Sequence, residues 1–339
     1  MARRRMKSKI QPAEMKIAVK LDPGVNYIDL SQLASIVNRR FYRQGLNWVV
    51  SHFTCFKGTS TEEGNEAIQI ERLPNTWVMS NAWTKGFKAW QEMIKNAAEE
   101  TDQQSVMGKF LDFKIFADED HYSNGFERNL MPVQSVTGSE ATPGQYLPAV
   151  IEVPVTRNNP TQSGETAEFS IMAVGPNYGS TGSLEVVSLI NGYANSRALP
   201  NVIDPNVPTD NSDANGATPE NWLAAIFNDG TNQAQGVLED AASYNEPPYP
   251  FEGGIDVDTG LPFADTMYPG GQEQLKDLTI HDAAYFNAGT NANKVTLEGG
   301  TFPCGLIKAT YQGDDFVSVI INLVPGKHRG YMAESMLEM

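Results

Sequence analysis

The sequence has few cysteines and no long apolar run, and each shortage excludes a class of protein. Cys55 and Cys304 are the only 2 cysteines in 339 residues. They are too few for a disulfide scaffold and lack the C-x-x-C spacing of a metal site. We expect two buried thiols, with a single bridge between them as the alternative. Every apolar stretch is interrupted well before the roughly 18 residues of a membrane helix, so no membrane partner is expected.

Catalytic motifs are missing as well. The 4 histidines are scattered along the chain, and none belongs to an H-E-x-x-H motif. The sequence contains neither a G-x-S-x-G nucleophile elbow nor a P-loop that would hold phosphates. The pair His281-Asp282 is typical of a satisfied polar pair. The sequence therefore predicts a protein that is not an enzyme.

The charges of the chain are separated by sign. The chain has 25 Lys and Arg residues against 41 Asp and Glu residues, a net charge of -16. Residues 1–43 nevertheless hold ten basic and three acidic side chains, a net charge of +7, so the rest of the chain carries -23. Solubility requires charge but not its segregation, so we interpret the basic residues as candidates for binding a polyanion. They are Arg3, Arg4, Arg5, Lys7, Lys9, Lys16, Lys20, Arg39, Arg40 and Arg43.

The first residues allow two other interpretations, a solvated tail and a nuclear-localisation signal. Met1–Ile10 has the positive charge of a signal peptide, but the apolar segment that should follow is absent. We therefore expect no secretion by that route.

Strand patterns dominate the rest of the chain. Aromatic and β-branched residues, or apolar residues at every second position, predict about nine strands bounded by Gly, Pro, Asn or Asp. These segments are 46–56, 67–71, 110–116, 149–155, 167–174, 184–190, 294–297, 306–311 and 316–324. Pro154 marks its strand as an edge or a bulge. The pattern predicts an all-β protein, an antiparallel jelly-roll sandwich or a barrel.

Helical spacing is confined to a few segments. Leu30, Leu33, Ala34 and Val37 predict a short helix that begins after Asp29 as its N-cap. Trp83, Phe87, Trp90, Ile94 and Ala97 predict a second helix that starts near Asn81. We interpret its aromatic stripe as a core face rather than as a platform for stacking bases.

The predicted organisation is a basic N-terminal arm, residues 1–25, followed by one domain, residues 26–339. An elaborated loop insertion is expected at residues 192–276, which contain nine of the 20 prolines. A small helix inside it would begin at Thr218-Pro219-Glu220.

Within that insertion, Asp256 and Asp258 are candidate metal ligands. Two carboxylates at alternating positions before Gly260 are similar to the opening of a calcium loop. A third acid is missing, however, and position 12 of the loop is Met267 rather than Glu. A plain turn is therefore the favoured alternative, and no cofactor is predicted beyond Ca²⁺ at a contact between subunits.

Three patches of the chain resemble capsid proteins of circular, Rep-encoding single-stranded DNA viruses. They are Arg39-Arg-Phe-Tyr-Arg-Gln-Gly-Leu-Asn-Trp48, Leu73-Pro-Asn-Thr-Trp-Val-Met-Ser-Asn-Ala-Trp83 with Trp90, and Gly326-Lys-His-Arg-Gly-Tyr-Met-Ala-Glu334. The quoted patches make up about a tenth of the 339 residues.

The resemblance implies an eight-stranded jelly roll that assembles into a small icosahedral shell around a single-stranded DNA genome. It places Arg3, Arg4, Arg5, Lys7 and Lys9 on the phosphates and Arg39, Arg40 and Arg43 on the inner surface. The same resemblance implies that the protein is part of a virion, that assembly takes place in the host nucleus and that the shell binds an unidentified host receptor.

Two other classes of function remain open on the sequence alone. A carbohydrate-binding or adhesive β-sandwich would use exposed Tyr and Trp side chains and leaves the basic residues unexplained. A sandwich-type hydrolase would use paired carboxylates, whose spacing in space cannot be read from their spacing in sequence.

Overall fold

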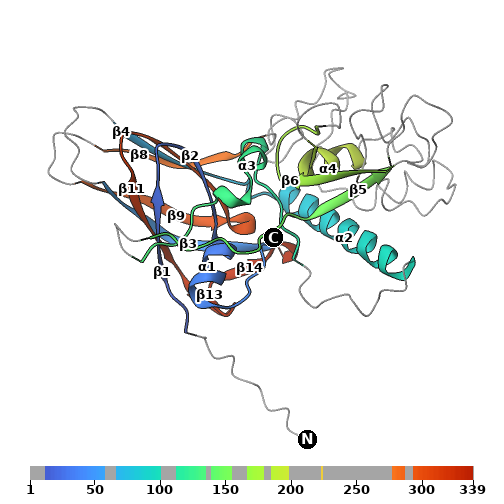
Figure 1. Ribbon diagram of the computed structural model, residues 1–339, viewed down its shortest axis with the longest axis horizontal. Coiled ribbons are helices and arrows are strands. Elements are labelled where there is room, and N and C mark those ends of the chain that lie inside the picture. The colour runs from blue at the N-terminus through green and yellow to red at the C-terminus, as the bar shows by residue number, and fades with distance from the viewer. Residues whose placement is uncertain are drawn as a thin grey trace, which may run out of the picture. The chain divides into compact units, whose positions relative to one another are not determined.

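The computed structural model describes residues 12–57, 66–100, 112–134, 139–154, 166–178, 185–197, 223, 277–286 and 293–338 (Figure 1). The chain forms two compact units. Unit 1 comprises Met1–Asn75, Gly125–Tyr146 and Thr279–Met339, and unit 2 comprises Thr76–Asn124 and Leu147–Leu278. The sequence analysis expected one domain over residues 26–339 and did not anticipate this division, because no linker composition marks it.

Unit 1 contains two antiparallel sheets that share one apolar core. The first sheet has the order β1 (Lys16–Leu21), β11 (Val317–Leu323), β3 (Leu46–Lys57) and β9 (Lys294–Phe302), with β14 (Ala333–Ser335) beside the start of β3. The second has the order β2 (Gly24–Asp29), β10 (Leu306–Gln312), β4 (Glu66–Arg72) and β8 (Thr279–Phe286). Among its described residues, unit 1 also contains three short 3-10 helices, η2 (Phe126–Arg128), η4 (Pro303–Gly305) and η5 (Met336–Glu338).

The core of unit 1 follows from the alternation of side chains along its strands. Strand β11 buries Val317, Val319, Ile321 and Leu323, as their period of two predicts. The opposing sheet contributes the apolar side chains of β2, β4 and β10 to the same cluster, among them Ile28, Ile68, Ile70, Ile307 and Ala309. Each Val, Ile or Leu side chain of this core stabilises the fold by about 1.5–3 kcal/mol when it is fully removed from water.

Six described strands of unit 1 were not predicted: β1, β2 and β8 of the two main sheets, and the short strands β12 (Pro325–Gly326), β13 (Gly330–Tyr331) and β14. Strand β1 lies inside the predicted arm of residues 1–25, yet it buries Ile17, Val19 and Leu21 and pairs with β11, Val19 lying opposite Val319. Its lysines point away from the core, which made it look like a solvated tail. Strands β2 and β8 were also missed, since β8 is a sheet edge whose Ile280 and Tyr285 remain exposed. The arm is therefore shorter than predicted, and its first eleven residues lie outside the described part of the chain.

Unit 2 combines helices with a small sheet. The helices are α2 (Trp77–Glu100), α3 (Glu119–Asn124) and α4 (Leu189–Arg197). The strands lie in the order β5 (Val150–Pro154), β6 (Thr166–Met172) and β7 (Val186–Ser188), and β6 pairs with β7 in parallel. The chain is thus rich in antiparallel strands, but unit 2 is not all-β. Pro154 lies on an edge strand, as predicted.

Three predicted boundaries in unit 2 were wrong. The predicted strand 184–190 is a strand only over Val186–Ser188 (β7), and Leu189 and Ile190 already belong to helix α4. Helix α2 begins at Trp77 instead of near Asn81, because Thr76 accepts hydrogen bonds from the first turn through its carbonyl and hydroxyl oxygens. The predicted strand 110–116 is only an isolated bridge at Phe116 among its described residues. The aromatic stripe of α2 is a core face, as expected, since Trp83 and Trp90 are buried against Phe113.

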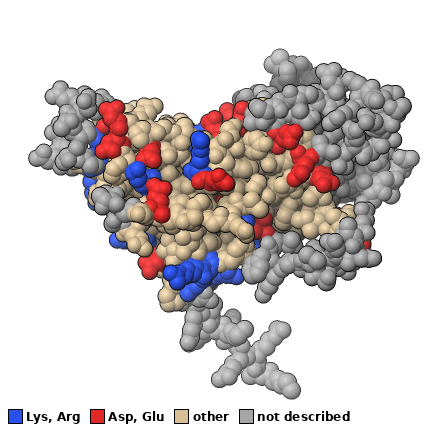
Figure 2. Space-filling view, viewed as in Figure 1, with Lys and Arg blue, Asp and Glu red and all other residues tan. Residues whose placement is uncertain are grey.

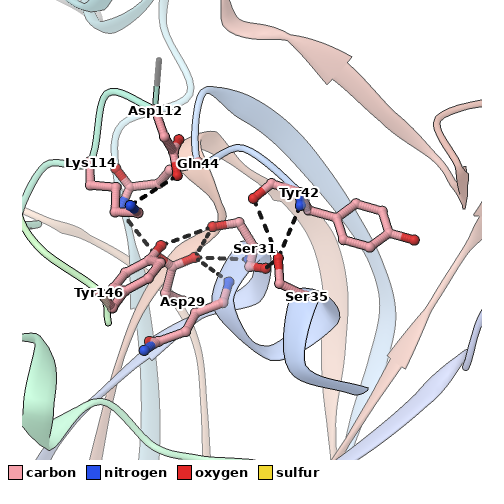
Figure 3. Close-up of polar contacts among 9 residues, drawn as sticks. Asp29, Ser31, Ser35, Tyr42, Gln44, Asp112, Lys114 and Tyr146 are labelled. Atoms are coloured by element: carbon pink, nitrogen blue, oxygen red, sulfur yellow. Dashed lines mark hydrogen bonds and ion pairs between the residues drawn. The ribbon is translucent and has the colours of Figure 1, made fainter. Parts of the chain in front are cut away.

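Helix α1 (Leu30–Asn38) starts at the predicted N-cap (Figure 3). Asp29 is fully buried, and one of its carboxylate oxygens accepts hydrogen bonds from the backbone N–H groups of Ser31 and Gln32. Its other oxygen accepts from the Gln44 amide, at 3.1 Å, and from the Tyr146 hydroxyl. Burial raises the pKa of Asp29 above its ordinary value, although each of these hydrogen bonds lowers it.

Candidate nucleic-acid interface

The loop that follows α1 carries three of the predicted basic residues and is folded back onto the helix. Ser35 holds it, because the Ser35 hydroxyl accepts a hydrogen bond from the backbone N–H of Tyr42 at 3.0 Å (Figure 3). The backbone N–H of Arg40 donates to the Ser35 carbonyl. Arg39 and Arg43 are exposed and Arg40 is half-buried. The loop thus presents its arginines from a fixed backbone.

The first described residues of the chain are tied to this loop. The Arg40 guanidinium donates to the carbonyl oxygen of Pro12 at 2.9 Å. The backbone N–H of Glu14 donates to the Asn38 side chain at 3.0 Å, and the Tyr331 hydroxyl donates to the Glu14 carbonyl at 2.7 Å. Burial raises the pKa of Tyr331 to about 12, so this hydroxyl remains a donor near neutral pH. The chain therefore leaves the folded body of unit 1 beside the Arg39–Arg43 loop.

A hairpin near the C-terminus reaches the same place. Strands β12 (Pro325–Gly326) and β13 (Gly330–Tyr331) flank Lys327, His328 and Arg329. The Arg329 guanidinium donates to the carbonyl of Phe41, and the Tyr42 hydroxyl donates to the carbonyl of Arg329 at 3.0 Å. Lys327 and Arg329 are exposed.

These two segments form one cationic surface, which we call the basic collar. Its members are Arg39, Arg40, Arg43, Lys327 and Arg329. Figure 2 shows Lys and Arg side chains gathered at the lower edge of the molecule, where Figure 1 places α1 and β13. Glu14 is an acid that the hydrogen bonds place beside the collar. Five basic side chains of a chain with net charge -16 therefore lie together, beside the first described residues of the chain.

Lys16 and Lys20, also predicted to bind nucleic acid, lie on β1 and are not members of the collar. The Lys20 ammonium forms an ion pair with Asp22 at 2.9 Å and lies 4.8 Å from the centre of the Phe316 ring. The hydrogen bond to Asp22 raises the pKa of Lys20. Because Asp22 already neutralises it, Lys20 is a weaker candidate for binding phosphate than the collar residues.

Two aromatic side chains near the collar, Tyr42 and Trp48, do not offer a surface for stacking bases. Tyr42 and Trp48 are buried and pack on each other and on Tyr331, with ring centres 5.4–5.8 Å apart. Phosphate binding is the chemistry that the cations of this surface offer.

Other predicted sites have different outcomes. Arg3, Arg4, Arg5, Lys7 and Lys9, as well as Asp256 and Asp258, lie outside the described residues. Within the described ranges, no group of three or more His, Cys, Asp or Glu side chains is placed to hold a metal ion. Cys55 and Cys304 are buried free thiols, and burial raises the pKa of Cys55 to about 12.

The His281-Asp282 pair has a structural role, as predicted. The Asp282 carboxylate accepts a hydrogen bond from the backbone N–H of Glu298, which joins β8 to β9, and another from the neighbouring Ala283 on β8. No described helix combines the length and apolar character needed to cross a membrane.

Sequence reasoning missed Lys327 and Arg329 as site residues, although they belong to a patch that carries the family resemblance. Charge alone did not single out two cations in an otherwise mixed C-terminal segment. Comparison with protein families, with curated proteins and with solved structures finds no match.

Proposed function

We propose that unit 1 is a jelly roll and that the protein is a viral capsid subunit, which assembles into a small icosahedral shell and packages single-stranded DNA. The observation that carries the proposal is the strand order. If the eight main strands are numbered along the chain, the first sheet reads 1-8-3-6 and the second reads 2-7-4-5. This antiparallel arrangement is the one expected of two Greek keys rolled into two facing sheets.

The position of unit 2 is compatible with this assignment. Its two segments join the chain between β4 and β8, the fourth and fifth strands of the roll, which are neighbours in one sheet. A loop between two strands can carry a large insertion without disturbing the sheets. The resemblance of three patches to capsid proteins of circular single-stranded DNA viruses points to the same class.

The charge distribution supports a polyanionic cargo. The leader, which we define as residues 1–11, contains five basic side chains and no acidic one. Lys and Arg bind phosphates by releasing condensed counterions and require no contact with base edges. An acidic body would repel nucleic acid elsewhere on the subunit. A packaged genome, a homo-oligomeric shell and a host receptor are therefore the proposed partners, with assembly in the host nucleus.

Electron microscopy of the expressed full-length protein tests the assembly. We expect closed particles of uniform diameter whose ultraviolet spectrum shows bound nucleic acid. The solution should be examined over a range of salt concentration and pH, because assembly of a charged subunit depends on both. Dispersed monomers under all of these conditions would contradict the capsid assignment and would favour the carbohydrate-binding alternative.

Neutralising the leader tests its role in binding. A full-length variant with Arg3, Arg4, Arg5, Lys7 and Lys9 replaced by Gln should fold normally, because β1 begins at Lys16. The slope of log K against log salt for a labelled oligo(dT) should become shallower by about 3 to 4, since each phosphate contact with a single strand contributes about 0.7. An unchanged slope would refute the role of the leader.

A further inference from the structure

We infer that the basic collar is a second binding site for the phosphodiester backbone, borne by the folded body of unit 1 and able to act without the leader. The inference rests on the proposed function, in which the polyanion is single-stranded nucleic acid. It assigns binding to Lys327 and Arg329, and it gives Arg39, Arg40 and Arg43 a fixed common geometry.

Two segments that are distant in sequence converge at the collar. Arg329 and Phe41 are 288 positions apart in sequence, and yet the Arg329 guanidinium donates to the Phe41 carbonyl. The Tyr42 hydroxyl returns a hydrogen bond to the Arg329 carbonyl at 3.0 Å. These contacts hold both backbones, so the cations are presented from a prearranged surface and lose less freedom on binding than those of a flexible tail.

Two collar arginines have an unusual backbone conformation. Among the described residues, three that are not glycine have a positive φ, namely Arg39 at 53°, Cys304 at 57° and Arg329 at 49°. Arg39 is the residue that ends α1 in the left-handed conformation, a position that strongly favours Gly. Side chains other than Gly are strained there, and such strain is concentrated at functional sites.

The dipole of helix α1 explains the presence of only some of the collar's cations. A cation near the C-terminal end of α1 is favoured by the helix dipole, which accounts for Arg39 and Arg40. It does not account for Lys327 and Arg329, which come from a hairpin.

The leader is attached next to the collar. Arg40 binds the carbonyl of Pro12, so the folded chain that follows the leader starts at the collar. A strand held by the leader is thereby kept at high effective concentration near the collar, and the two sites reinforce each other. The collar's cations contact phosphates, and the buried Tyr42 and Trp48 are not available to stack on bases. We expect binding without sequence preference.

The test uses the full-length chain with Arg39→Gly, Arg43→Gln and Lys327→Gln. Arg40 and Arg329 are kept, because their side chains bind the carbonyls of Pro12 and Phe41. The collar variant is made both in the natural sequence and in the leader-neutralised sequence. In each, the salt slope for labelled oligo(dT) should become shallower by about 2, as expected for three lost contacts.

A matched control removes the same number of charges elsewhere. Lys88, Lys95 and Arg128 are exposed and lie outside the collar, and their replacement by Gln should leave the salt slope unchanged. An equal change in the control would show that net charge and not the collar is responsible, and would overturn the inference. An unchanged slope in the collar variant, or a change only when the leader is intact, would overturn it too.

The single variant Arg39→Gly separates binding from folding. Its urea midpoint should be unchanged or higher, because Gly adopts the left-handed conformation without strain, while its affinity for oligo(dT) at low salt should fall about 3-fold or more. A lower midpoint with unchanged affinity would assign Arg39 a structural role and contradict the inference. Oligonucleotide binding does not require shells, so failure of the collar and failure of the capsid assignment are distinguishable.

Discussion

Replacing Glu66 by Ala is expected to lower the free energy of unfolding of the subunit by about 3–5 kcal/mol. Glu66 is a buried carboxylate at the start of β4. One of its oxygens pairs with the Lys57 ammonium at the end of β3, and the other accepts a hydrogen bond from the Tyr311 hydroxyl on β10. The cluster therefore links the two sheets of unit 1.

The large effect follows from what the substitution leaves behind. The side chain of Lys57 is only 10% exposed, so its charge would remain in the protein without its counter-ion. Tyr311, whose pKa is raised by burial and by the hydrogen bond to Glu66, would lose its acceptor. The chain turns tightly here, since a Cβ on Gly313 would lie 2.2 Å from the Tyr311 hydroxyl oxygen. Such a site leaves little space for the neighbours to rearrange.

A triple variant provides the control. Replacing Lys57 by Met, Glu66 by Leu and Tyr311 by Phe removes all the polar groups together and should cost far less than Glu66→Ala, because buried ion pairs are often replaceable by apolar residues at little loss. Urea unfolding at one low protein concentration, where the subunit is unassembled, measures both. A triple variant as unstable as Glu66→Ala would show that packing and not the uncompensated charge dominates.

The sequence predicted the parts of the fold whose pattern is strong and local. Strands β3 and β11 have long β-branched and aromatic runs, and α1 has a clear cap and an apolar stripe. Strand β1 was missed because its charged and apolar residues alternate within a basic segment. Its burial depends on pairing with β11, almost 300 positions away. No local pattern contains that information.

The candidate site shows the same division between local and distant information. Arg39, Arg40 and Arg43 were singled out by a local excess of positive charge, whereas Lys327 and Arg329 were not. The latter two reach the collar because β11 and β14 both pair with β3, which brings the C-terminal segment beside the loop after α1. Pairing between strands distant in sequence thus completes the site, and charge counts along the chain cannot reveal it.

Replacing Asp29 by Ala is expected to lower the free energy of unfolding by about 3 kcal/mol or more. Loss of the N-cap costs about 1 kcal/mol. Each buried donor that loses this acceptor adds about 1–3 kcal/mol, and the Ser31 hydroxyl, the Gln44 amide and the Tyr146 hydroxyl all donate to Asp29. Urea unfolding measures the loss, and a change below about 1 kcal/mol would contradict the role of this network.

Asp29→Asn separates the charge from the cap, because Asn is an equally good N-cap residue. Burial holds the pKa of Asp29 above its ordinary value of 3.8, so the folded state binds this proton more tightly than the unfolded state. The contribution of Asp29 to stability is then greatest below pH 3.8 and is lost as the pH rises through the folded pKa. The stability of the natural protein relative to Asp29→Asn should fall over this window and level off above it. A difference that rises with pH would reverse the sign and show that the hydrogen bonds outweigh burial.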